Sequence, residues 1–245
     1  MPDEFDGDLS GAVFWGADLR GARFRDVNLT DATISHAWLV DVEIDAFIDR
    51  VVVNGVDVTA FVNERDRWYP LRAVLGAADP ESMRAGWTAL QEAWAATIDR
   101  ARRLPDEDLH ASVDGEWSFV QTLRHLLFAT DIWVSRAILG DPTPWHRLSL
   151  PFDEMEPDPD VPWDLEARPA LDEVVALRAE RRATVRRVIE GLTAETLAGA
   201  TTPVEGPGYP PADAYPVAGC LGTVLTEEWQ HRLYAERDLD VLEGR

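Results

Sequence analysis

Lysine is absent from the sequence, cysteine occurs once, and no long apolar run is present. Without lysine, all 23 basic side chains are arginines, which excludes Schiff-base chemistry and the phosphate-binding lysine of a P-loop. The single cysteine, Cys220, cannot form a disulfide within the chain, a usage typical of a reducing compartment. No apolar run reaches the roughly 18 residues that span a bilayer, and the first residues lack the basic and apolar regions of a secretion signal. We therefore expect a cytoplasmic protein with no membrane partner.

Basic charge is also scarce, since 23 bases stand against 45 acids and the formal net charge is −22. Binding to a nucleic-acid backbone requires a basic surface that neutralises phosphates, so we expect no nucleic-acid partner. Apolar residues nevertheless make up 46% of the 245 residues, and ten residues are tryptophan. This content and length predict a folded protein with one good-sized domain and a smaller one.

Residues 7–46 contain a strict repeat of five residues, which neither a helix nor a flat strand explains. A small or short apolar residue stands two positions before each large apolar one. The large residues are Leu9, Phe14, Leu19, Phe24, Leu29, Ile34, Leu39 and Ile44. The pattern resembles the pentapeptide-repeat fold, a right-handed quadrilateral β-solenoid. This resemblance implies that the large residues fill the axis and that the eight repeats make about two coils.

A solenoid this short needs a cap or a partner surface. Asn54-Gly55, between two β-branched runs, is a strong signal for a hairpin, and we expect this hairpin to close the open end. The interpretation therefore assigns residues 1–62 to a capped solenoid and residues 63–79 to a linker.

The solenoid has two candidate roles. Some pentapeptide-repeat proteins mimic DNA and bind type II topoisomerases, but this segment is much shorter, and Arg20, Arg23 and Arg25 interrupt its acidic face. A structural cap or a dimerisation surface is therefore favoured.

Helical patterns dominate residues 80–245, so the fold class is expected to be mainly α. In the first helix, apolar residues recur at alternating steps of three and four, as in a buried seam. These residues are Met83, Trp87, Leu90, Trp94 and Ile98. The second helix begins at Ser118, a capping residue, and is apolar on most faces. The predicted helices are 80–104, 118–139, 169–197 and one that begins near 217.

Three polar residues in these helices are a candidate metal site. His125 lies within the apolar second helix, where an imidazole is costly unless it is satisfied. Glu227 and His231 are four residues apart and project from one face of the last helix. Two imidazoles and a carboxylate suit zinc, nickel or ferrous iron. The alternative is a solvated Glu–His ion pair and a hydrogen-bonded core histidine.

The sequence resembles the DinB superfamily, which includes mycothiol-dependent maleylpyruvate isomerases. The resemblance covers about residues 80 to 240. It rests on Trp117-Ser118, on Leu123-x-His125-Leu126, on Glu227-x-x-x-His231 and on Arg237-Asp238-Leu239. It implies a four-helix bundle that holds a divalent metal with three histidines. His125 matches the first ligand and His231 the third, while Glu227 stands where the family usually has its middle histidine.

By this resemblance the protein is a metal-dependent small-molecule enzyme, a thiol S-transferase or isomerase with mycothiol as candidate co-substrate. Tyr234 is expected to orient the ligands or the substrate, and Glu228 to act as a base. Family bundles commonly pair, so a homodimer is expected, and the arginine-only, alanine-rich composition suggests an actinobacterial source. The alternative is a non-catalytic protein that assembles a complex.

Two other segments have more than one interpretation. The acidic, proline-rich stretch 141–168 is either a lid over a pocket or an inert insertion. Five arginines on the third helix either pair with acids elsewhere or include one that clamps a substrate carboxylate. They are Arg178, Arg181, Arg182, Arg186 and Arg187.

Overall fold

The computed structural model describes residues 5, 7–24, 27–44, 46–66, 69, 79–153, 155–156 and 158–244. The chain divides into two compact units, residues 1–45 and residues 46–245. Most of the predicted linker, 63–79, lies outside the described residues. Within the described residues, no helix is both long and apolar enough to cross a membrane.

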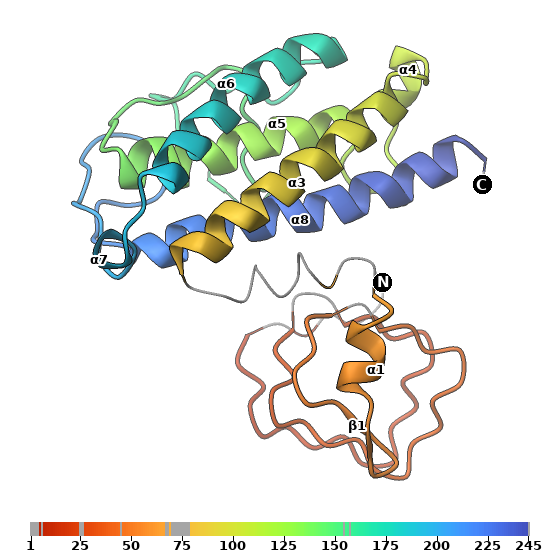
Figure 1. Cartoon of the computed structure of the whole chain (residues 1–245). Coiled ribbons are helices and arrows are strands. Elements are labelled where there is room, and N and C mark those ends of the chain that lie inside the picture. Colours follow the sequence, from red (N-terminus) through yellow and green to blue (C-terminus); the bar gives the residue numbers. More distant parts are fainter. Residues whose placement is uncertain are drawn as a thin grey trace. The chain divides into compact units, whose positions relative to one another are not determined.

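In the first unit, the five-residue repeat of the sequence is a repeat of backbone corners. Left-handed φ angles between 55° and 78° recur at Gly11, Gly16, Gly21, Asp31, His36 and Asp41. Every second corner lies within a tight turn, in which the amides of Ala12, Ala22 and Ala32 donate to the carbonyl three residues earlier at 2.9–3.0 Å. The trace winds as a coil through these corners (Figure 1).

The large residues of the repeat are still substantially exposed, from 48% at Leu19 to 73% at Ile44. No strand is assigned among the described residues of this unit. In a solenoid of very few coils, each coil is covered by a neighbouring coil on one side at most. Side chains on its uncovered side therefore remain exposed to solvent. The β-solenoid itself therefore stays a prediction.

The second unit begins with the predicted hairpin. Strands β1 (Val52–Val53) and β2 (Val56–Asp57) are antiparallel, with Val53 opposite Val56. Asn54 and Gly55 form the turn with φ of 50° and 82°, the two left-handed residues that such a hairpin requires. The second β-branched run of the hairpin forms only a short strand, because helix α1 (Thr59–Asn63) begins soon after it.

The rest of the second unit is mainly helical, and its long helices form a bundle (Figure 1). Helix α3 contacts α6 and α8, and α5 contacts the same two, so the four close a ring. A π-helical segment, η1, continues α5, and two short helices lie between the long ones. The bounds are α3 Pro80–Ala101, α4 Asp106–Leu109, α5 Phe119–Thr130, η1 Asp131–Ile138, α6 Leu171–Glu190, α7 Ala194–Leu197 and α8 Val217–Leu242.

Local signals set the helix starts. Asp79 accepts hydrogen bonds from the amides of Glu81 and Ser82 at the start of α3. Ser118 and Gln121 form a reciprocal capping box at the start of α5. The five seam residues predicted for α3 are at most 4% exposed, and all of α5 except Gln121 is buried. The predicted third helix is interrupted after Glu190, and α7 begins at a new cap, Thr193.

Two buried arginines hold the long loops against the bundle. Arg124 of α5 donates to the carbonyl oxygens of Leu148, Asp164, Leu165 and Ala167. Arg136 of η1 donates to those of Pro142, Val204, Gly206 and Pro210. A guanidinium has five donors in a rigid fork, so a single side chain can satisfy several turns of irregular backbone. Loop 141–168 is therefore anchored to α5 and η1.

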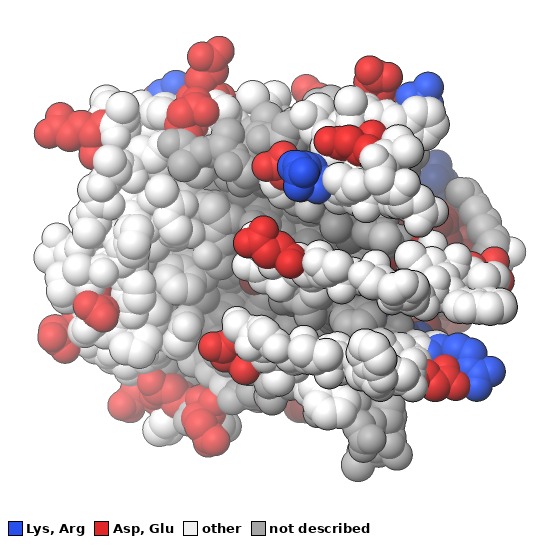
Figure 2. Space-filling view, turned by 90° about the horizontal axis from the view of Figure 1, so that it is seen from below, with Lys and Arg blue, Asp and Glu red and all other residues white. Residues whose placement is uncertain are grey.

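One face of the molecule is drawn in Figure 2. Acidic side chains are scattered over it, with few basic ones between them. The described part of this face therefore shows no concentrated basic patch.

Candidate metal centre

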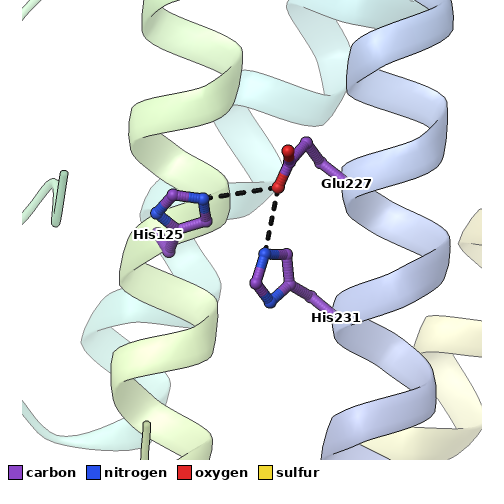
Figure 3. A group of neighbouring side chains, drawn as sticks. All are labelled: His125, Glu227 and His231. Carbon is purple, nitrogen blue, oxygen red and sulfur yellow. Dashed lines mark ion pairs between the residues drawn. The ribbon is translucent and has the colours of Figure 1, made fainter. Parts of the chain in front are cut away.

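Two helices that are far apart in the sequence bring three polar side chains together. His125 comes from α5, and Glu227 and His231 come from successive turns of α8 (Figure 3). One carboxylate oxygen, Oε2 of Glu227, lies 3.3 Å from Nε2 of His125 and 3.0 Å from Nε2 of His231. One ligand atom from each residue lies within 4.8 Å of the other two. The structure thus brings together all three residues of the predicted metal site.

A hydrogen bond to the backbone fixes the tautomer of His125. Its Nδ1 lies 3.0 Å from the carbonyl oxygen of Leu150. Because a carbonyl only accepts, Nδ1 carries the hydrogen and donates it. The Leu150 amide in turn donates to the carbonyl of Arg124 at 3.2 Å, which holds this part of the loop beside α5. When His125 is neutral, its Nε2 therefore presents a lone pair toward Glu227, the arrangement typical of a histidine ligand.

This geometry fits a divalent cation. A lone pair facing a carboxylate oxygen at 3.3 Å is repulsive unless a proton or a cation lies between them. Bonds from zinc to imidazole nitrogen or carboxylate oxygen are about 2.0–2.2 Å, which sets neighbouring ligand atoms roughly 3–3.5 Å apart. Both separations from Glu227 satisfy this, and a set of two nitrogens and one oxygen leaves positions for water or substrate.

The carboxylate of Glu227 is held ionised. Burial alone raises the pKa of this group, but hydrogen bonds with His125 and His231, and their charges, outweigh burial and lower the pKa to about 2. The side chain is 31% exposed, against 8% for His125 and 15% for His231. Glu227 therefore offers a carboxylate at neutral pH, and solvent reaches the site from its side.

Aromatic rings surround the two imidazoles. The ring of Trp117 has its centroid 4.6 Å from that of His125 and 5.8 Å from that of His231. Phe128, one turn beyond His125, lies 5.7 Å from its ring. Tyr234 meets His231 edge to face with ring centroids 5.9 Å apart, so this predicted site residue is adjacent to a candidate ligand.

Glu228 is placed elsewhere. Its carboxylate accepts a hydrogen bond from Arg178 of α6 at 2.8 Å, and both side chains are 2% exposed. The Arg178 guanidinium also lies 5.0 Å from the ring of Trp94. Because this carboxylate belongs to a core ion pair, we leave Glu228 out of the site. Of the two roles considered for the arginine cluster, Arg178 has the structural one, pairing with an acid, and not that of a substrate clamp.

Cys220, at the start of α8, is 2% exposed, and burial raises the pKa of its thiol to about 11. It is therefore not a thiolate at neutral pH.

Two buried or packed features of this domain were not predicted from the sequence. The first is Trp117, which was noted only as part of a motif. The second is a buried cluster in which Asp131 of η1 accepts from Arg181 and from Ser149, each at 3.0 Å. An acid directly before Ile132 in an apolar helix was the available signal for the cluster. No comparable signal points to the position of the Trp117 ring.

Comparison with known families agrees with the helical fold of the second unit. A sequence model of the DinB superfamily matches residues 89–235, more than half of the chain, and the protein belongs to this superfamily. A model of pentapeptide repeats matches residues 8–42 with eight copies. No curated protein and no solved structure matches the chain. Both resemblances inferred from the sequence are thus confirmed.

Proposed function

We propose that this protein binds one divalent metal ion through His125, Glu227 and His231 and uses it in small-molecule chemistry. The observation that carries the proposal is the approach of Glu227 Oε2 to both Nε2 atoms, at 3.0 and 3.3 Å, with the His125 hydrogen held on Nδ1. Membership of the DinB superfamily, whose bundles usually bind metal, supports it.

Zinc, nickel and ferrous iron are the candidate ions. When bound, such an ion lowers the pKa of a water or thiol and so supplies a nucleophile near neutral pH. The chain's own residues have separate tasks. The Leu150 carbonyl fixes the His125 tautomer, Glu227 supplies the negative charge, and Tyr234 orients His231 or the substrate.

The substrate class follows from the family resemblance. We propose transfer or isomerisation with a low-molecular-weight thiol, mycothiol if the source is an actinobacterium, in a cytoplasmic homodimer. The pentapeptide segment is proposed to form a β-solenoid within a domain of residues 1–62. This domain serves as a structural cap or pairing surface.

A second candidate function is a metal-free assembly protein. The specific observation in its favour is that Glu227 already lies within ion-pair distance of both histidines. In that case His125 is an imidazolium, which donates from Nδ1 to Leu150 and from Nε2 to Glu227. A buried cation of this kind is tolerated because it is paired and hydrogen-bonded.

Metal content separates the two functions. Untagged protein, loaded with zinc, nickel or ferrous iron and passed through a desalting column, is expected to retain about one ion per chain. His125→Ala and His231→Ala should each lose it, while His36→Asn, a change at an exposed left-handed corner residue of the first unit, should keep it. Folded wild-type protein that retains none of the three metals would overturn the proposal.

A further inference from the structure

Trp117 contacts both histidines of the candidate centre although it lies on neither ligand helix. Its ring is tilted by 41° to His125 and lies nearly parallel to His231, with an interplanar angle of 19°. The two imidazoles are themselves 4.8 Å apart, centroid to centroid. One indole therefore covers a ligand from α5 and a ligand from α8 at once.

Two attachments hold this indole in place. On the backbone side, Trp117 directly precedes Ser118, the cap of α5, and follows a sharp turn in which Asp114 and Gly115 have φ of 53° and 81°. On the ring side, Nε1–H donates to Oδ1 of Asp153 at 3.1 Å. Asp153 belongs to the acidic loop 141–168, which Arg124 anchors to α5.

The same loop therefore makes two separate contacts with the centre. Leu150 binds Nδ1 of His125 directly, and Asp153 binds the indole that covers both imidazoles. A group that already holds a histidine ring in its ligating orientation increases metal affinity. The ring then loses less rotational entropy when the ion binds. An indole packed on the rings also excludes water from that side.

We propose that Trp117 and Asp153 are a positioning pair for the metal centre: Asp153 holds the indole, and the indole holds His125 and His231 in their ligating orientation. This inference rests on the proposed metal site. Neither residue is a ligand, so both act through the histidines.

Zinc affinity of the full chain, measured by competition with a chromogenic chelator, tests the pair. Asp153→Ala is expected to raise the Kd about tenfold, a typical effect of losing a group that orients a ligand. Asp153→Asn keeps an acceptor for the indole N–H and should restore most of the affinity. Asp160→Ala removes an exposed acid from the same loop and should leave the Kd unchanged.

The decisive comparison uses Trp117→Phe, which keeps an aromatic ring but removes the N–H. In this background Asp153→Ala has no hydrogen bond to break, so it should change the Kd less than twofold, the non-additivity expected of coupled residues. An equal loss in both backgrounds would mean that Asp153 acts only through its charge, and no loss in either would overturn the pair.

A measurement on metal-free protein tests the positioning pair separately from the metal site. Histidine ring-proton NMR signals of metal-free protein should shift on Asp153→Ala for His125 and His231, and stay fixed for His36, His110 and His146. If wild-type protein binds no zinc, the metal proposal falls, and these signals alone decide whether the pair positions the rings. Unshifted signals for His125 and His231 would contradict it.

Discussion

Two neighbouring glutamate residues of α8 have completely different environments. Glu227 faces His125 of α5 and is 31% exposed, while Glu228 faces Arg178 of α6 and is 2% exposed. Successive residues of a helix point about 100° apart, so sequence spacing shows that they diverge. It does not show which of the two faces which partner helix, and for that reason the sequence suggested a role in the site for both.

The ion pair of Glu228 predicts a stability effect without a metal effect. Glu228→Gln removes the charge opposite Arg178 in the core and should lower the free energy of unfolding by about 3–5 kcal/mol. The matched change Glu180→Gln, at a 72% exposed acid on α6 that lies near Arg181, should cost less than about 0.5 kcal/mol. Urea denaturation and zinc content measure the two properties. Normal stability combined with lost metal would return Glu228 to the site.

At the scale of elements, the cluster around Asp131 joins three segments. Asp131 belongs to η1, Arg181 to α6 and Ser149 to loop 141–168. Asp131 is 1% exposed, and burial raises the pKa of its carboxyl to about 6 despite the opposing effects of Arg181 and Ser149. The π-helical turns begin at this residue, and such segments are rare and often lie near functional sites.

This raised pKa predicts a pH dependence. The folded state holds the Asp131 proton more tightly than the unfolded chain, so the associated stability is full below about pH 4 and is lost as the pH rises through about 6. Asp131→Asn cannot titrate. The unfolding free energy of the wild type relative to this variant should therefore fall by about 1–1.5 kcal/mol between pH 5 and pH 7.5. Urea titrations at several pH values measure this difference in unfolding free energy. A difference that stays constant or rises with pH would show that folding does not raise the pKa of Asp131.

The loops show what local sequence cannot predict. The proline-rich composition of 141–168 indicated an irregular segment, and the structure has one. Its conformation, however, depends on Arg124 and Arg136, which lie outside the loop and donate to backbone carbonyls. Any residue supplies a carbonyl, so no side-chain pattern marks the partners. The position of Trp117 was hidden for a different reason: its partner is a side chain, the Asp153 carboxylate, but it lies 36 residues away.

At the scale of the whole molecule, both family assignments were available from periodicity and motifs. A period of five identified the repeats at 8–42, and alternating apolar steps located the helices of the bundle. Spacing placed Glu227 and His231 on one face, but it could not bring His125 to them. Grouping His125 with them rested on ligand chemistry and was then supported by the family resemblance. The contact between α5 and α8 provides its physical basis.

Anomalous diffraction from crystals of zinc-loaded protein shows whether His125, Glu227 and His231 share one ion. We expect a single strong peak at the zinc edge within about 2.3 Å of Nε2 of His125, Nε2 of His231 and a carboxylate oxygen of Glu227. A difference map with no peak between these atoms, and with Glu227 still bridging both imidazoles, would contradict it.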